Sequence, residues 1–373
     1  MNQIRVGIIG FGVGKLHATA LRSVGLYYRG FPPIDFVAVA TATPESGQRA
    51  VEDFGFEWST TDYHRLLEDK EINTLVIATP TDWHLPMLKD ALHSGKAIYM
   101  DKPLAVNLDQ AEQLWDTAQQ TGNNAQMAFE FRFCPALQTA HDIIQDGHLG
   151  ELYAFRLSYF RSSYVDPNKP LRWKGKAQSD GGVLNDYASH LIDLLLWLTQ
   201  SPQSIAAQKR TFITERPIHK GAQDKTPVET DDHTTLLCSM PEGGTGTIEV
   251  GRLITGAVNA MVVELYGSKA SLKWNLMNPN YLLLAQGTHP SGESGWVHIP
   301  TAQRYPDAML PGGDVPVGMM RFHIASVADF LRRTLAGEPY DPDIAQGLRV
   351  QAVIEAANRS VQLETWAQVP LQD

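Results

Sequence analysis

Three residues near the middle of the chain have side chains suited to proton transfer. Asp186, His190 and Asp193 follow the pair Gly181-Gly182, and they are spaced four and three residues apart. Residues at these spacings are neighbours on a helix, so a carboxylate and an imidazole would lie side by side. Such a pair can bind a hydroxyl and accept its proton near neutral pH. A helix whose His and Asp only cap or pair is the simpler alternative.

A second set of residues predicts how this helix is held. Apolar side chains recur at helical spacing and predict a buried stripe, which comprises Leu184, Ala188, Leu191, Leu195 and Leu198. We expect Asp186, His190 and Asp193 to lie on a different face from this stripe.

Lys102 is the strongest candidate for a reactive group in the first half. The predicted strand Ala97–Met100 ends in Asp101-Lys102-Pro103. A lysine on a surface helix is usually only solvated. One that ends a buried strand and precedes a proline has a restricted backbone, so we interpret it as directed at a ligand.

The N-terminal residues have the local pattern of a dinucleotide-binding turn. A predicted strand, Ile4–Ile9, leads into Gly10-Phe11-Gly12-Val13-Gly14, and a helical pattern follows from Lys15 to Val24. Glycines allow close approach of the backbone to a pyrophosphate, which the N–H groups of the helix can bind. The third glycine comes one position earlier than in G-x-G-x-x-G, and an ordinary tight turn is the alternative.

The end of the second predicted strand, Phe36–Ala40, bears on the choice of cofactor. An acidic residue at this point would bind the ribose 2′-hydroxyl of NAD. The chain has Thr41 there instead, and the nearest arginine is Arg49. The sequence therefore predicts NAD or NADP without choosing between them.

Strands and helices alternate through the first half. Thr74–Ala78 and Gln126–Phe129 are further predicted strands, and Pro86–His93 and Asp109–Gln120 are predicted helices. This alternation predicts a doubly wound parallel sheet, whose ligands lie beyond the carboxyl ends of the strands. The loop residues Thr79, Pro80 and His84 and the turn of Asp101 and Lys102 would join the glycine loop and Thr41 at that edge.

The second half of the sequence has a different order of predicted strands and helices. After an expected connecting helix, 131–146, several strands follow one another without helices between them. They are 151–160, 204–212, 233–240, 245–252, 259–266, 271–274 and 281–284. Successive strands of this kind indicate an antiparallel sheet. We expect the helix with Asp186 and His190 to cover one face, while the other face meets a second subunit or solvent.

Two helices, 322–336 and 343–362, and a short strand, 366–369, are predicted at the end of the chain.

The loop between residues 161 and 176 contains Tyr164, Arg172, Trp173 and Lys174. Basic and aromatic side chains together can bind single-stranded nucleic acid. The acidic total argues against that, so we expect Arg172 and Trp173 to lie over a substrate pocket or on a plain surface loop.

Composition limits the classes of function. The 373 residues are 43% hydrophobic and 19% charged, with a net charge of −10. This charge argues against nucleic acid and anionic membranes as partners, and no apolar run is long enough to span a bilayer. Two well-separated cysteines and no signal-peptide pattern predict reduced thiols in a cytoplasmic protein.

Together these motifs resemble the Gfo/Idh/MocA oxidoreductase family over nearly the whole chain. The motifs are Gly10-x-Gly12 with His17, Thr79-Pro80-Thr81-x-x-His84, Asp101-Lys102-Pro103, Phe131-Arg132-Phe133, Gly181-Gly182-x-Leu184-x-Asp186-x-x-x-His190-x-x-Asp193 and Tyr266-Gly267-Ser268-Lys269. The family usually has Glu-Lys-Pro where this chain has Asp101-Lys102-Pro103.

The resemblance implies a two-domain enzyme. A Rossmann NAD(P)-binding domain would occupy residues 1–126, and an α+β domain with a large open, mainly antiparallel sheet would occupy 127–373. That second domain would bind a sugar, cyclitol or related polyol and form homodimers or homotetramers through its sheet. Gly10, Phe11, Gly12, Val13, Gly14, Thr41, Thr79, Pro80, His84, Asp101 and Lys102 would contact the cofactor.

The family's catalytic lysine, aspartate and histidine map onto Lys102, Asp186 and His190, which would also contact substrate together with Arg172 and Trp173. His190, or Lys102 if a positive nicotinamide lowers its pKa, would accept the hydroxyl proton during hydride transfer. Three alternatives are a non-catalytic regulatory protein that binds dinucleotide or sugar, a metal-dependent hydrolase using His84, Asp186 and His190, and a purely structural Rossmann protein. We expect no metal.

Overall fold

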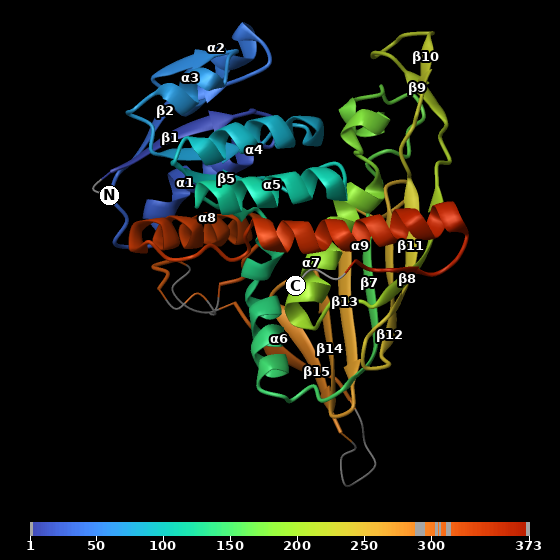
Figure 1. Cartoon of the computed structure of the whole chain (residues 1–373). Coiled ribbons are helices and arrows are strands. Elements are labelled where there is room, and N and C mark those ends of the chain that lie inside the picture. The colour runs from blue at the N-terminus through green and yellow to red at the C-terminus, as the bar shows by residue number, and fades with distance from the viewer. Residues whose placement is uncertain (1–2, 288–294, 303–304, 306, 311–314, 371–373) are drawn as a thin grey trace. The chain divides into compact units, whose positions relative to one another are not determined.

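A computed structural model of the chain describes residues 3–287, 295–302, 305, 307–310 and 315–370 (Figure 1). The chain forms two compact units. Unit 1 comprises Met1–Phe133, Pro306–Gly313 and Gly318–Leu348, and unit 2 comprises Cys134–Tyr305, Asp314–Val317 and Arg349–Asp373. The functional division at residue 126 that the sequence suggests stays a prediction.

Unit 1 contains a six-stranded parallel sheet in the order β3-β2-β1-β4-β5-β6. The strands are β1 (Ile4–Ile9), β2 (Ile34–Ala40), β3 (Trp58–Thr60), β4 (Thr74–Ile77), β5 (Ala97–Met100) and β6 (Ala125–Met127). Every ladder in this sheet is parallel. The predicted doubly wound sheet is confirmed, and β3 adds a short edge strand to it.

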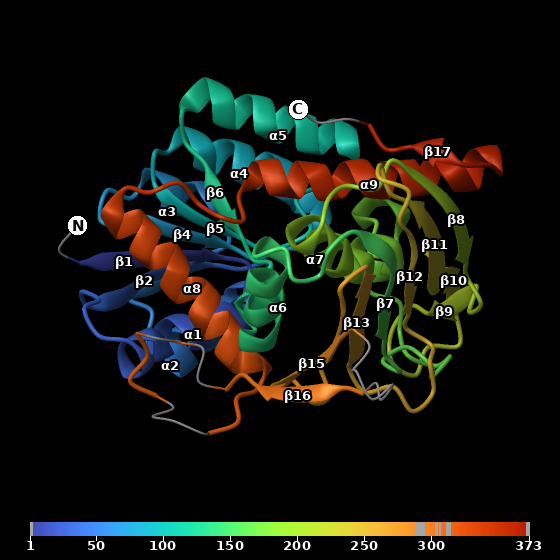
Figure 2. The same ribbon diagram turned by 90° about the horizontal axis from the view of Figure 1, so that it is seen from below.

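Helices lie on both faces of this sheet (Figure 2). They are α1 (Gly14–Tyr27), α2 (Pro44–Phe54), α3 (His64–Glu68), α4 (His84–His93), α5 (Leu108–Thr121) and α8 (Met319–Ala336). Helix α8 comes from the far end of the sequence and packs against α1 and β5.

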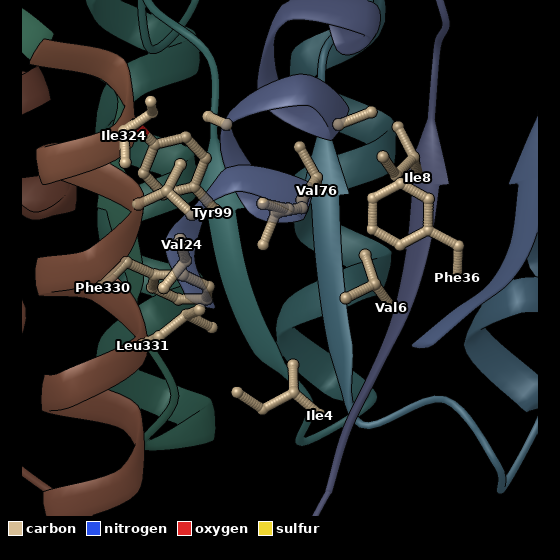
Figure 3. Packing of buried hydrophobic residues seen from close by; sticks show 14 of the residues in the cluster. Ile4, Val6, Ile8, Val24, Phe36, Val76, Tyr99, Ile324, Phe330 and Leu331 are labelled. Atoms are coloured by element: carbon tan, nitrogen blue, oxygen red, sulfur yellow. The ribbon is translucent and has the colours of Figure 1, made fainter. Parts of the chain in front are cut away.

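The core of unit 1 joins α8 to the sheet. Ile324, Phe330 and Leu331 of α8 lie against Tyr99 and Val24, as Figure 3 shows. All five side chains are at most 2% exposed. Burial of apolar area on this scale stabilises the sheet and fixes the strand ends that follow it.

Unit 2 contains a nine-stranded sheet in the order β16-β15-β14-β13-β7-β12-β11-β8-β17. Its strands are β7 (Leu152–Phe160), β8 (Ser204–Arg210), β11 (His233–Ser239), β12 (Thr245–Gly251), β13 (Ala260–Gly267), β14 (Ala270–Asn275), β15 (Tyr281–Gln286), β16 (Val297–Pro300) and β17 (Ala367–Gln368). All pairs are antiparallel except β7 and β12, which are parallel. The predicted mainly antiparallel sheet is confirmed. A separate hairpin is formed by β9 (Glu215–Pro217) and β10 (Lys225–Pro227).

Two expectations about helices need correction. The connecting helix expected over 131–146 is split into a short 3-10 turn, Glu130–Phe133, and α6 (Pro135–Gln145), because Pro135 can begin a helix but cannot continue one. The helix with Asp186 begins as a π-turn, Leu184–Ala188, before α7 (Ser189–Leu198). The last helix is α9 (Ile344–Leu363).

Helices α6 and α7 pack on one face of the large sheet. The opposite face shows a row of paired residues that runs from Leu237 through Thr247, Arg156, Glu264 and Lys273 to Leu283. Arg156 and Lys273 both contact the carboxylate of Glu264.

No helix in the described part of the chain is both long and apolar enough to cross a membrane.

Candidate active site

The carboxyl ends of the central strands of unit 1 lie next to one another. Backbone hydrogen bonds continue just beyond the strands, from Gly10 N to Ala40 O (2.9 Å), from Ala78 N to Ile9 O (2.8 Å) and from Asp101 N to Ile77 O (2.8 Å). The glycine loop, Thr41, Thr79 and Asp101 therefore come together at one edge of the sheet, which is the expected ligand edge.

The glycine loop fits a dinucleotide. Gly10 has a φ of +87°, and a Cβ there would stand 2.4 Å from the carbonyl oxygen of Ala78. At Gly12 a Cβ would meet no atom within 4 Å, so this position borders open space. Helix α1 begins immediately afterwards without a side-chain cap or an acidic residue in its first turn. Its free N–H groups can therefore bind a pyrophosphate.

Gly14 takes the place of the third glycine of the longer motif, although it comes one position earlier. A Cβ at Gly14 would lie 3.2 Å from Cγ2 of Ile8. This glycine lets α1 approach β1 closely, which is the role that the third glycine has in the longer motif. Phe11 is buried against Phe54 and Phe56, whereas Val13 is 48% exposed.

A cavity of about 790 Å³ lies where β2 and β3 end. It is lined by Pro44, Glu45, Gln48, Arg49, Ser59, Thr60 and Thr61. Thr41, at the end of β2, is buried and donates its hydroxyl to the carbonyl of Thr43. Glu45 offers a carboxylate for a ribose hydroxyl, and Arg49 offers a guanidinium for a 2′-phosphate. Arg49 is predicted from the sequence, but Glu45 is not, because the acidic residue is expected at the end of the strand.

His84 links two of the loops at the strand ends. Its Nδ1 lies 2.7 Å from the carbonyl of Pro103, and its Nε2 lies 3.0 Å from the carbonyl of Thr79. Burial lowers the pKa of His84, while Asp101 and these carbonyls act in the opposite direction. Both ring nitrogens are thus engaged within the protein, and a contact between His84 and the cofactor stays a prediction.

Asp101 holds the backbone of Lys102. Its Oδ1 accepts the Lys102 N–H at 2.9 Å and lies 3.8 Å from Nε2 of the buried His17. Burial would raise the pKa of Asp101, but His17, Lys102 and His84 outweigh burial and hold that pKa at about 2. The carboxylate is therefore ionised at neutral pH and anchors the turn that carries Lys102.

The paired glycines of unit 2 allow a close approach at the start of the helix that carries Asp186 and His190. A Cβ on Gly181 would stand 2.3 Å from the Cα of Lys174, and one on Gly182 would stand 1.9 Å from Oδ1 of Asp231. Oδ2 of Asp231 accepts the Leu184 N–H at 3.0 Å, which caps the π-turn. Neither contact tolerates a side chain at the glycine positions.

Asp186 lies on the π-turn and forms an ion pair with Lys174. The side chains are 13% and 30% exposed, respectively, so the pair is partly shielded from water. Lys174 is held in turn, since its carbonyl accepts the hydroxyl of Thr230 at 2.9 Å. The sequence predicts Lys174 in a loop but not its contact with Asp186, because nothing in the spacing of the two residues indicates a contact across that turn.

Both faces of this helix are buried. The stripe from Leu184 to Leu198 is buried as predicted, and on the polar side His190 is only 7% exposed and Asp193 only 1% exposed. The helix is therefore covered on both sides, as in the interior of a large domain. His190 lies in the first turn of α7, and its ring lies 6.2 Å from that of Tyr159.

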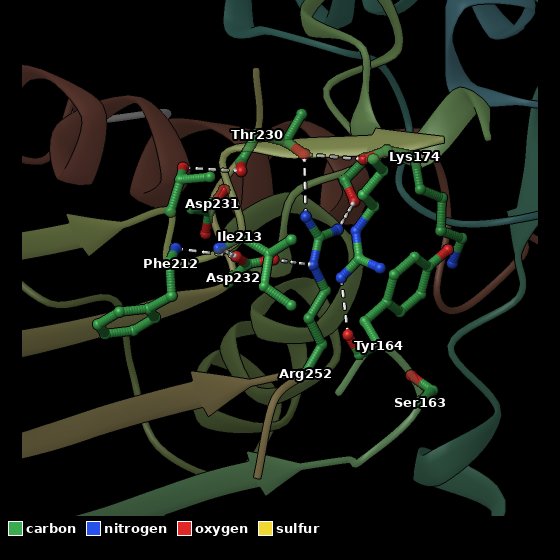
Figure 4. A network of polar contacts seen from close by, with 12 residues as sticks. Ser163, Tyr164, Lys174, Phe212, Ile213, Thr230, Asp231, Asp232 and Arg252 are labelled. Atoms are coloured by element: carbon green, nitrogen blue, oxygen red, sulfur yellow. Dashed lines mark hydrogen bonds and ion pairs between the residues drawn. The ribbon is translucent and has the colours of Figure 1, made fainter. Parts of the chain in front are cut away.

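A polar network holds the loop that contains Arg172 and Trp173 (Figure 4). Arg252 donates to Asp232 at 2.7 Å, to the carbonyl of Gly181 at 3.3 Å and to the hydroxyl of Thr230 at 3.2 Å. Arg172 is exposed at the start of a 3-10 turn, Trp173–Gly175. The network ties this loop to Gly181, just before the helix that carries Asp186 and His190.

The candidate residues thus form two groups, one in each unit. Unit 1 brings together the glycine loop, Thr41, Thr79, His84, Asp101 and Lys102, and unit 2 brings together Arg172, Trp173, Lys174, Asp186 and His190. Among the described residues there is no group of three or more His, Cys, Asp or Glu side chains that could hold a metal ion.

Comparison with known proteins identifies similar chains. Residues 4–129 match a family profile described as an oxidoreductase family with an NAD-binding Rossmann fold, and residues 137–273 match the GFO/IDH/MocA C-terminal domain. Levoglucosan dehydrogenase of Pseudarthrobacter phenanthrenivorans is 29% identical over 386 aligned residues, covering 99% of each chain. Inositol 2-dehydrogenase of Rhizobium meliloti is 24% identical, covering 96% of this chain and 97% of its own. A solved levoglucosan dehydrogenase complex with NADH and L-sorbose superposes with a TM-score of 0.94 at 28% identity, covering both chains completely.

Proposed function

The chain belongs to the Gfo/Idh/MocA family of NAD-binding oxidoreductases, and we propose that Lys102, Asp186 and His190 are its catalytic residues. The reaction is hydride transfer between a nicotinamide cofactor and a secondary alcohol or ketone, and the proposed substrate is a sugar, cyclitol or related polyol. Relatives named for levoglucosan and inositol support this substrate class.

The nicotinamide, when bound, supplies the hydride acceptor or donor, and the side chains manage the proton and the charge. His190 accepts the proton of the reacting hydroxyl, because an imidazole titrates near neutral pH. Lys102 donates a hydrogen bond to the same oxygen and stabilises its negative charge. Asp186 orients the hydroxyl, and Lys174 keeps that carboxylate in place. Arg172 and Trp173 contact other parts of the substrate.

The cofactor assignments follow the glycine loop. Gly10, Phe11, Gly12, Val13 and Gly14 would receive the pyrophosphate. Thr41 would lie near the adenosine ribose, and Thr79, Pro80, His84 and Asp101 near the nicotinamide half. Residues 1–126 form the proposed cofactor domain, and 127–373 the proposed substrate and oligomerisation domain, which would form homodimers or homotetramers through the outer face of its sheet. Two buried free cysteines support a reducing, cytoplasmic location.

The observation that carries the proposal is the Asp186 carboxylate, which Lys174 holds four residues before His190. Neither a regulatory protein nor a structural Rossmann protein needs this partly shielded ion pair beside a histidine. A metal-dependent hydrolase would need ligands grouped around an ion.

A turnover screen tests the proposal. Purified protein is mixed with NAD+ or NADP+ and with a panel of sugars and cyclitols, and formation of the reduced nicotinamide is followed by its absorbance. We expect turnover of at least one polyol with one cofactor. Tight cofactor binding without turnover of any polyol would favour the regulatory alternative.

A further inference from the structure

The loop beside Asp186 is unusual for a chain with a net charge of −10, because positive side chains gather there. Six of them form what we call the basic cluster: Arg161, Lys169, Arg172, Lys174, Arg216 and Arg252. Three of the six surround the ring of Tyr164. The Lys169 ammonium lies 4.2 Å from the ring centre, and the guanidinium carbons of Arg252 and Arg216 lie 4.8 and 5.2 Å from it.

Only two of these cations have a carboxylate at ion-pair distance within the described part of the chain. Lys174 pairs with Asp186, and Arg252 pairs with Asp232. Arg216 is 1% exposed, yet its guanidinium contacts carbonyl oxygens of Tyr164, Asp166 and Lys169 rather than a carboxylate. Nε of Arg161 is buried and lacks a hydrogen-bond partner among the described residues.

The surplus of positive charge in the basic cluster affects the pKa of Lys169. Burial lowers the pKa of Lys169, and the charges of Arg172, Arg216, Arg161 and Lys174 lower it further. Like charges at close range cost free energy that an anion would recover on binding. Asp166, the acidic residue within this loop, accepts the N–H of Asn168 with its carboxylate at 2.8 Å, and Glu229 accepts the N–H of Ala177 at 2.9 Å.

We propose that the polyol substrate carries an anionic group, a carboxylate or a phosphate, which the basic cluster binds through Arg161, Lys169 and Arg172. The inference rests on the proposed function, because it assigns the substrate to the site of Asp186. A neutral sugar would gain nothing from the unpaired guanidinium groups. An anionic one would be drawn toward the site and oriented by them, since guanidinium binds carboxylate and phosphate with two parallel hydrogen bonds.

Calorimetric titration of the full-length protein tests this inference. The probes are D-glucuronate, D-glucose 6-phosphate and D-glucose, the neutral parent of both anions. We expect one of the anions to bind about tenfold or more tightly than glucose, with an advantage that shrinks at high salt. A preference for glucuronate or for the phosphate distinguishes the two anionic groups.

Variants identify the residues responsible. Arg172→Gln and Arg161→Gln should each remove most of the anion's advantage, whereas Lys220→Gln, an exposed lysine in another loop of unit 2, should not. The inference is overturned if neither anion binds more tightly than glucose, or if the advantage survives both arginine substitutions.

Turnover measured in parallel separates this inference from the proposed function. Hydride transfer with a neutral polyol but no tighter anion binding overturns the inference and leaves the function standing. Anion binding that depends on Arg161 and Arg172, without turnover of any polyol, supports the cluster and contradicts the catalytic assignment.

Discussion

Asp186 depends for its position on a residue twelve places earlier in the chain. Lys174 reaches it across a turn that Thr230, Gly181 and Arg252 hold in place. In the proposed mechanism the lysine is a positioning residue, because it would act on the substrate through the carboxylate of Asp186.

Lys174→Met should lower kcat by about ten- to a hundredfold while changing KM less, because the substrate hydroxyl loses an oriented acceptor. Steady-state kinetics would measure kcat and KM separately. Lys174→Arg should restore most of the rate, and a Lys174→Met enzyme with wild-type kcat would contradict the role.

Asp180 lies immediately before the paired glycines and titrates in an unusual range. Burial raises its pKa to about 6, and Asp231 contributes, while Lys209 opposes the shift. An acid whose pKa is raised in the folded state destabilises the fold above its unfolded pKa of about 4. The loss grows as pH rises toward 6 and is constant above it. Asp180 also has a left-handed backbone, with φ of 37°.

Asp180→Asn should therefore raise the free energy of unfolding by about 2 kcal/mol at pH 7, after allowance for partial exposure. Asparagine also tolerates the left-handed conformation, but that gain does not depend on pH. Urea unfolding at pH 4 and pH 7 separates the two effects. An equal gain at both pH values would show that the carboxylate does not carry the raised pKa.

Among the secondary-structure elements, the turn between β1 and α1 contains two glycines with different surroundings. Gly10 needs its positive φ and its contact with Ala78, whereas Gly12 borders open space. We therefore expect Gly10 to be needed for folding and Gly12 for binding of the cofactor.

Gly12→Ala should leave the thermal midpoint unchanged and weaken cofactor binding by about tenfold or more, because a methyl group would occupy space needed by the pyrophosphate. Gly10→Ala should instead destabilise the fold by about 1–3 kcal/mol. Calorimetry with NAD(H) and NADP(H), together with thermal unfolding, measures both. Undiminished cofactor affinity in a folded Gly12→Ala protein would contradict the proposal that the glycine loop binds the pyrophosphate.

The elements that the sequence predicts well are those with continuous apolar patterns. Strands β1, β4 and β5 and helices α1 and α8 are predicted within a few residues for this reason. Strands β3, β9 and β10 have only three residues each, and the four residues of β16, Val-His-Ile-Pro, contain no continuous apolar run. The π-turn at Asp186 was missed because it differs from an α-helix only in hydrogen bonding, and the break before α6 was missed because Pro135 also suits the first turn of a helix.

The site was predicted less completely than the fold. Glycine, lysine, aspartate and histidine candidates are visible as sequence motifs. The partners Lys174, Asp231 and Arg252 are not, because they meet Asp186 and its helix only through turns and strands distant in sequence. The parallel pairing of β7 and β12 was missed for the same reason, since consecutive strands favour an antiparallel prediction.

At the scale of the whole molecule, the outer face of the nine-stranded sheet offers a surface for self-association. Its row of paired residues includes Leu237, which is 47% exposed. Oppositely charged side chains, Arg156, Glu264 and Lys273, contact one another farther along the same row. A face that repeats in both copies suits a symmetric interface.

Light scattering should give a mass two or four times the 41.3 kDa of the single chain. Leu237→Glu should shift the protein toward the single-chain mass, because a charge would be buried in the interface. The matched change Leu363→Glu, at an exposed position near the end of α9, should not. A wild-type protein of single-chain mass would contradict assembly through this sheet.

We propose that Lys102 contributes more to the chemistry of hydride transfer than to binding of the cofactor, and substitution of this lysine separates the two contributions. Once a turned-over polyol is known, kcat and cofactor affinity are measured for the wild type and for Lys102→Ala. We predict that kcat falls by about a hundredfold or more while cofactor affinity stays within a few fold. A variant with near-normal kcat, or one that loses only cofactor affinity, would contradict the catalytic assignment.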